Sequence, residues 1–133
     1  MSASRRLGSD FEDQAADFLL TQGFTIVTRR FRARRGELDL VALDGDLLVF
    51  VEVKQRKDGY VPEEAIGSQK IERLYSAARE YLQSTDQSDR EFRFDVVAIS
   101  GSEIRHHRDV FKDRVDLEAD DFNIESEPYS TDH

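Results

Sequence analysis

The chain has 133 residues, no cysteine and a formal net charge of −9 at pH 7. This length suits a single domain with one modest core, and the lack of cysteine excludes disulfides, thiolate catalysis and cysteine-based zinc sites. No apolar run approaches the roughly 18 residues that a membrane-spanning helix needs. No apolar segment follows Arg5 and Arg6 either. We therefore expect no secretory signal, no membrane partner and a cytoplasmic location.

Most of the excess negative charge lies near the C-terminus. The last 25 residues contain nine acidic and two basic residues, whereas the first 35 contain seven arginines and four acidic residues. Because the local potential decides whether a phosphate backbone can approach, the net charge does not exclude a nucleic-acid partner. We expect residues 1–111 to form one domain and residues 112–133 to form a flexible acidic tail.

The first part of the chain predicts a helix and then a strand. Residues 9–23 (SDFEDQAADFLLTQG) carry apolar side chains at helical spacing, with Ser9 or Asp10 as the cap and Gly23 as the stop. Residues 24–31 (FTIVTRRF) are β-branched and aromatic, which predicts a strand. Residues 32–36 (RARRG) then form a basic connection, and five arginines lie within residues 29–35 (RRFRARR).

The remaining elements predict a mixed sheet flanked by helices. Residues 37–43 and 47–53 form a hairpin, and a helix begins near Ser68. A strand follows at residues 92–99, with a short edge strand at residues 103–107. The expected fold class is α/β, with the core order α-β-β-β-α-β.

The hairpin contains charged residues where apolar ones are expected. Asp44-Gly45 is typical of a two-residue type I′ turn, and it would pair Leu43 with Asp46. Asp39 would then lie diagonally across from Glu52, and Glu37 would lie directly opposite Glu52. Alternate residues share a face of a strand, so this pairing places four charged side chains on one face. These are Glu37, Asp39, Glu52 and Lys54, and the other face, residues 38, 40, 42, 47, 49, 51 and 53, is entirely apolar.

Two carboxylates and a lysine on adjacent strands are the groups that phosphodiester hydrolysis requires. Mg²⁺ prefers hard oxygen ligands and needs only one or two carboxylates, which Asp39 and Glu52 would supply, with the carbonyl of Val53 as a further ligand. The metal offsets charge on the phosphate and lowers the pKa of a bound water. Lys54 would orient that water or stabilise the pentavalent phosphate.

The spacing Asp39-x12-Glu52-Val-Lys54 resembles the PD-(D/E)xK signature of restriction-endonuclease-like nucleases. Four longer segments resemble the YraN family of bacterial endonuclease-like proteins, and the resemblance covers roughly residues 8–111. They are GSDFEDQAADFL, RRGELDLVALDGDLLVFVEVKQR, EEAIGSQKIERLYSAAREYL and RFDVV. The resemblance implies a restriction-endonuclease-like core and cleavage of DNA with Mg²⁺ or Mn²⁺. It also implies that Glu12, on the first helix, joins the metal site, as in related junction-resolving nucleases, which work as dimers.

Several of these residues have a plainer interpretation. Asp39 and Lys54 could form a structural ion pair on an exposed sheet face. Against this, three acids outnumber one lysine on that face, and a cation would relieve their repulsion. Glu37 could be a ligand or a solvated acid at the end of a strand, and Glu12, without the resemblance, is an acid near a helix N-terminus.

The basic residues around the hairpin complete the predicted site. A run of arginines is usually a solvated loop, but here it leads into the two carboxylates and could contact phosphates. The candidates are Arg30, Arg32, Arg34, Arg35, Arg56 and Lys70. No element for reading base sequence is present, so we expect a DNA endonuclease specific for branched or other non-B-form substrates, acting as a homodimer. The alternative is a nucleic-acid-binding or adaptor module with this fold and little or no cleavage activity.

Overall fold

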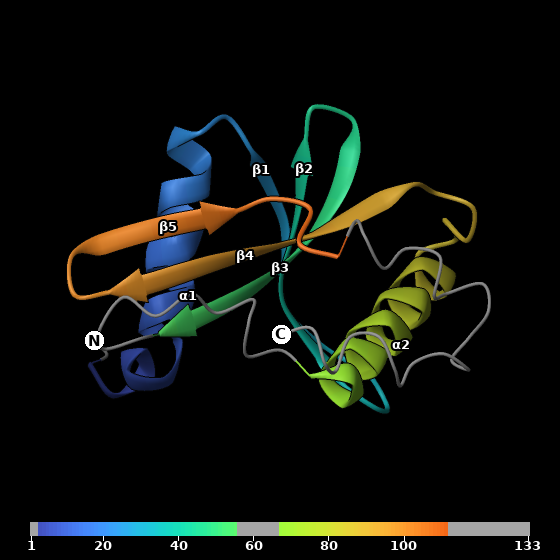
Figure 1. Ribbon diagram of the computed structural model, residues 1–133, viewed down its shortest axis with the longest axis horizontal. Coiled ribbons are helices and arrows are strands. Elements are labelled where there is room, and N and C mark those ends of the chain that lie inside the picture. The colour runs from blue at the N-terminus through green and yellow to red at the C-terminus, as the bar shows by residue number, and fades with distance from the viewer. Residues whose placement is uncertain (1–2, 56–66, 112–133) are drawn as a thin grey trace.

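The computed structural model describes residues 3–55 and 67–111 (Figure 1). The elements in chain order are α1 (Ala3–Thr21), β1 (Thr25–Arg32), β2 (Glu37–Asp44), β3 (Leu47–Gln55), α2 (Ser68–Ser84), β4 (Phe92–Ser100) and β5 (Glu103–His107). The predicted order α-β-β-β-α-β is confirmed, and the short edge strand extends it to α-β-β-β-α-β-β. Arg56 and the acidic tail at residues 112–133 lie outside the described residues.

The five strands form one mixed sheet in the order β1-β2-β3-β4-β5. All neighbours are antiparallel except β3 and β4, which run parallel. This parallel pair requires the chain to cross over between β3 and β4, and helix α2 belongs to that crossover. The arrangement confirms the expected α/β class and is consistent with a nuclease-like fold.

The two helices cover opposite faces of the strongly twisted sheet (Figure 1). Helix α1 packs Ala15, Ala16 and Leu19 against the first face, and helix α2 packs Leu74, Ala78 and other residues against the second. On the first face lie Leu40, Ala42, Val49 and Val51, and on the second lie Val41, Leu48, Phe50, Phe94 and Val96. The predicted apolar face is thus covered by α1, except that Leu38 packs with the α2 cluster. The face that carries the charged residues is not left to solvent. Helix α2 covers the apolar residues of that face, among them Val41, Leu48 and Phe50.

Helix α1 starts six residues before the predicted cap. It begins at Ala3, so Ser9 and Asp10 lie inside the helix and neither is its cap. Its predicted end is confirmed, because the helix stops at Thr21 and Gly23 follows with a φ of 94°. The start of α2 at Ser68 is confirmed as well.

The hairpin turn is one residue further along than the sequence predicts. Asp44 pairs with Leu47, so the two loop residues are Gly45 and Asp46, and only Gly45 has a positive φ, at 67°. This is the pattern of a type II′ turn rather than type I′. The Asp44 carboxylate also accepts a hydrogen bond from Arg93, at 3.1 Å.

The corrected turn changes which residues of the hairpin are opposite one another. Leu43 pairs with Leu48 instead of Asp46, and a shift of two residues does not by itself change the face on which a side chain lies. The last β2–β3 pair is Leu40 with Val51, so Asp39 and Glu52 are the next residues of the two strands after the pairing ends. The predicted opposition of Glu37 and Glu52 is wrong.

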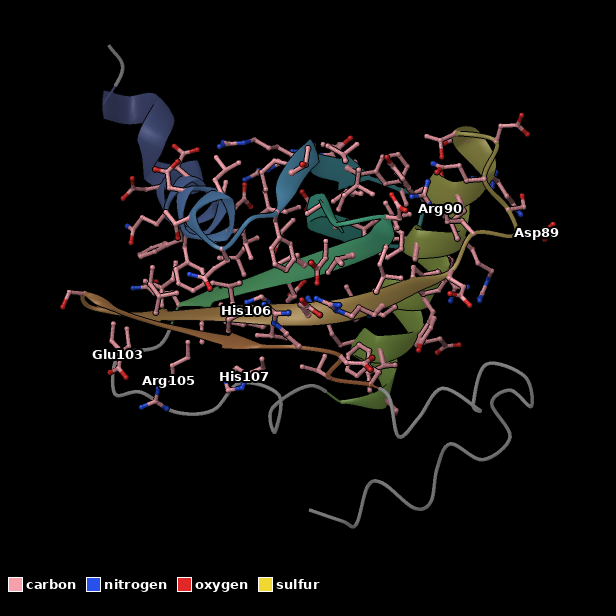
Figure 2. The ribbon with its side chains drawn as sticks, turned by 90° about the horizontal axis from the view of Figure 1, so that it is seen from above. Asp89, Arg90, Glu103, Arg105, His106 and His107 are labelled. Atoms are coloured by element: carbon pink, nitrogen blue, oxygen red, sulfur yellow. The ribbon has the colours of Figure 1, made fainter. Side chains whose placement is uncertain are left out.

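A buried ion cluster joins β4 to β5 and to the residues that follow β5. Asp95 of β4 has no exposed surface and accepts hydrogen bonds from Arg93 at 2.8 Å and from the Asp109 N–H at 2.9 Å, with His106 Nε2 also at 2.9 Å. Figure 2 shows His106 on the opposite side of β5 from Glu103, Arg105 and His107. No helix in the described ranges is long and apolar enough to cross a membrane.

Candidate functional site

Asp39 and Glu52 meet in a pocket between the sheet and helix α2. The pocket has a volume of about 560 Å³ and takes residues from β1, β2, β3, α2 and the β1–β2 connection. Its lining residues are Arg32, Ala33, Gly36, Glu37, Asp39, Glu52, Lys70, Arg73 and Leu74. The pocket opens where β2 and β3 end their pairing, so the carboxylates lie at the edge of the core and within reach of a ligand.

The Asp39 carboxylate is held by the backbone of the neighbouring strand. The Val53 N–H donates to Asp39 Oδ2 at 2.8 Å. Partial burial of Asp39 and the charge of Glu52, with a smaller effect of Glu12, raise the pKa of Asp39 to about 7 from 3.8. The Val53 hydrogen bond and the charge of Lys70 oppose this rise. Burial and the neighbouring Glu52 thus outweigh the groups that favour the charged form of Asp39.

The Glu52 carboxylate is buried, and two lysines contact one of its oxygens. Lys70 Nζ lies 3.1 Å and Lys54 Nζ 3.5 Å from Glu52 Oε2. Lys54 therefore lies beside Glu52, as the alternation along β3 predicts. Among the described residues no ion pair joins Lys54 to Asp39, so the plainer expectation of an Asp39–Lys54 pair is wrong.

Glu12 faces the same region but is bound to an arginine. Arg30 donates hydrogen bonds to both Glu12 oxygens, at 3.0 and 3.1 Å, and these bonds raise the pKa of Arg30. Arg30 has a φ of 52°, which is unusual for a residue other than glycine and costs of order 1 kcal/mol or more. Within residues 3–55 and 67–111, no group of three or more acids or histidines is placed to hold one ion. The supporting role of Glu12 stays a prediction.

The other predicted basic residues differ in whether they already contact acidic groups of the protein. Arg32 is exposed, and its Nε lies 3.8 Å from Glu37 Oε2. The Arg34 backbone N–H donates to Glu80 at 3.0 Å, which ties the connection after β1 to α2. Arg35 is exposed as well. Phosphate binding by these residues and by Lys70 stays a prediction.

Arg73 and Gly36 are among the pocket residues that were not predicted from the sequence. Arg73 follows Lys70 by three residues on α2, and that spacing is the one signal that could have identified it. Gly36 lies against α2 so closely that a Cβ there would be 2.8 Å from the Arg73 backbone oxygen. This contact requires glycine because any side chain would collide with the helix backbone.

The side chains of the pocket fit a divalent cation of the Mg²⁺ class. Two carboxylates supply hard oxygens, and Mg²⁺ is commonly bound by one or two of them together with waters. Burial and, to a smaller extent, the charge of Glu52 raise the pKa of Asp39, and a bound cation would favour the charged form of this carboxylate. The Val53 carbonyl as a third ligand stays a prediction.

The chain is similar to a group of bacterial proteins of undescribed function. The family model "Uncharacterised protein family UPF0102" matches residues 11–99. A UPF0102 protein of Rhodococcus opacus is 42% identical over 118 residues, which cover 84% of this chain and 100% of the relative. Relatives from Chromohalobacter salexigens and Persephonella marina are 45% and 36% identical, covering 74% and 78% of this chain and 81% and 91% of their own. The matched range includes Glu12, Asp39, Glu52, Lys54 and Lys70.

Proposed function

The chain belongs to the uncharacterised protein family UPF0102, the YraN family. We propose that it is a Mg²⁺-dependent endonuclease that hydrolyses phosphodiester bonds of DNA. The observation that carries this proposal is the position of Asp39 and Glu52 on adjacent strands in one pocket, with Lys54 beside Glu52. Branched or other non-B-form DNA is the proposed substrate class.

Each residue of the site has a distinct role in the proposed reaction. Asp39 and Glu52 would hold Mg²⁺ or Mn²⁺, together with the Val53 carbonyl. The bound metal would offset phosphate charge and lower the pKa of its water. Lys54 would orient the attacking water or stabilise the charge of the pentavalent phosphate. The Val53 N–H fixes the Asp39 side chain, so this carboxylate needs little reorganisation.

The proposed substrate class follows from what surrounds the site. Arg32, Lys70 and Arg73 bring positive charge to the pocket, and positive charge attracts phosphate without reading sequence. The described residues include no helix-turn-helix or other base-reading motif. DNA shape is therefore the proposed basis of recognition. A homodimer would bring two copies of the site to the two strands of a substrate.

A nucleic-acid-binding module without cleavage is the second candidate. It is favoured by the two lysines on Glu52, which already compensate this carboxylate, and by the pairing of Glu12 with Arg30. A protein of this kind would bind DNA through the same surface and leave the phosphodiester bond intact.

A cleavage assay with matched variants separates the two candidates. Purified full-length protein is incubated with supercoiled, single-stranded and four-way-junction DNA in Mg²⁺, Mn²⁺ or EDTA. Asp39→Asn and Lys54→Ala test the site, and Asp89→Asn, an exposed acid on the α2–β4 connection (Figure 2), is the control. An endonuclease cuts in metal, loses cutting in the first two variants and keeps it in the third. DNA binding without cutting by any version identifies the module, and cutting that survives Asp39→Asn contradicts the site.

A further inference from the structure

Helix α2 presents two cations to the pocket that holds the carboxylates. Lys70 and Arg73 are three residues apart, which places them on the same side of the helix, and both line the pocket. Leu74, only 3% exposed, anchors this part of α2 in the core. The positions of the two cations are therefore set by a packed helix rather than by a loop.

A close contact with the β1–β2 connection brings a further arginine to the same pocket. Gly36 lies against the Arg73 backbone, and its carbonyl accepts a hydrogen bond from the Ala33 N–H at 2.8 Å. This turn holds the end of β1 beside α2, so that Arg32 and Arg73 line one pocket although 41 positions separate them in the sequence.

The basic side chains of the pocket differ in whether they lie close to one of its acidic side chains. Lys70 contacts Glu52 at 3.1 Å, and Arg32 lies 3.8 Å from Glu37. Arg73 is exposed, and in the described part of the chain its guanidinium has no ion pair or hydrogen bond. The N–H donors of the Arg73 guanidinium are therefore available to bind an external anion.

We propose that Arg73, together with Arg32, forms a phosphate-binding subsite beside Asp39 and Glu52. It holds a backbone phosphate next to the one that is cleaved. A guanidinium matches phosphate because it donates two parallel hydrogen bonds to two of its oxygens. The inference rests on the proposed function and narrows its substrate to a polynucleotide, because a mononucleotide with one phosphate cannot occupy both positions.

The charge pattern of the pocket explains why such a subsite is needed. Asp39, Glu52 and Glu37 repel the backbone of DNA wherever no cation stands between them and the phosphates. Arg73 and Arg32 lie at the same pocket and supply attraction that does not depend on the carboxylates. Loss of Arg73 is therefore expected to weaken DNA binding while leaving the chemical step intact.

The salt dependence of DNA binding tests the subsite. The probe is a fluorescein-labelled four-way junction, and binding to the full chain is measured by anisotropy over a range of NaCl concentrations in Ca²⁺ buffer without Mg²⁺ or Mn²⁺. Arg73→Gln should reduce the slope of log affinity against log salt by about 0.9 and weaken binding about fivefold near 0.15 M salt, as expected for one lost phosphate contact. Arg73→Lys should retain most of the slope, because it keeps the charge.

A charge-matched control separates the subsite from a general loss of positive charge. Arg105→Gln removes one charge from β5, at the edge of the sheet opposite β1 (Figure 2), and should leave the slope unchanged. In cleavage assays Arg73→Gln should raise KM several-fold with kcat within about twofold, whereas Lys54→Ala should lower kcat.

The outcomes distinguish failure of the subsite from failure of the proposed function. If wild type binds the junction and cleaves it through Asp39, but Arg73→Gln keeps the wild-type slope, the subsite is wrong and the endonuclease stands. Equal effects of Arg73→Gln and Arg105→Gln also overturn the subsite. If wild type neither binds nor cuts the junction, both proposals are wrong.

Discussion

The backbone N–H of Val53 donates a hydrogen bond to the Asp39 carboxylate, with 2.8 Å between Val53 N and Asp39 Oδ2. The last backbone pair of the two strands, Leu40 with Val51, lies immediately before this contact. A side chain thus takes the place of the main-chain acceptor where β2 and β3 separate. The separation opens the pocket, and the same hydrogen bond holds the carboxylate at its edge.

Replacement of Asp39 should stabilise the protein at neutral and alkaline pH. The pKa of Asp39 is about 7 in the folded state and 3.8 ordinarily, so the folded state binds the extra proton between these values. Stability contributed by this residue therefore falls as pH rises from about 4 to about 7. Asp39→Asn should be about 1–2 kcal/mol more stable than wild type at pH 8 and nearly equal at pH 4. Chemical denaturation of both proteins at pH 4 and pH 8 measures their free energies of unfolding. An equal difference between Asp39→Asn and wild type at the two pH values would contradict the raised pKa.

Mg²⁺ should stabilise the folded chain through the two carboxylates. At about 100 times its dissociation constant, an ion bound only by the folded state adds about 2.7 kcal/mol. Asp39→Asn should abolish the increase in melting temperature, and Asp89→Asn should retain it. The increase in wild type should be larger at pH 8 than at pH 5, because the ion competes with the Asp39 proton. A shift that survives in Asp39→Asn would place the ion elsewhere.

Replacement of Asp95 should destabilise the fold. Burial alone would raise the pKa of Asp95, but hydrogen bonds from His106, Arg93 and the Asp109 N–H lower it below 3.8. The contribution of Asp95 is therefore present above its ordinary pKa and is lost as pH falls through the lower folded value. Asp95→Asn should cost about 3 kcal/mol at pH 7, because it leaves the positive charge of Arg93 partly uncompensated. Urea denaturation measures the loss, and a variant as stable as Asp89→Asn contradicts it.

A methyl group at Gly36 should disturb the pocket. The added Cβ would lie 2.8 Å from the Arg73 backbone oxygen, so the connection or the helix must move. Gly36→Ala should cost about 1–3 kcal/mol by overpacking. Gly67→Ala is the matched control, since a Cβ there meets nothing within 4 Å, and it should cost less than about 1 kcal/mol. Equal melting temperatures of the two variants would show that the contact is readily relieved.

The hairpin shows how far local reasoning reaches and where it stops. Alternation correctly placed Asp39, Glu52 and Lys54 on one face, and this survived an error in the turn because a two-residue shift preserves the face. The turn itself was misplaced by one residue, because Asp44 pairs with Leu47 within the sheet, and its carboxylate also contacts Arg93, 49 positions away. The turn preference of a dipeptide does not take account of a contact with a residue so distant in the sequence.

The sequence by itself determined the order of elements, the strands that carry the two carboxylates, and Lys54 beside Glu52. These features follow from side-chain periodicity, which is a local property of the chain. Only the tertiary structure decided that Glu12 binds Arg30, that Lys70 reaches Glu52 and that Arg73 shares the pocket. It also decided the raised pKa of Asp39. The physical reason is that desolvation and charge interactions are summed over residues that only the packing of the helices against the sheet brings together.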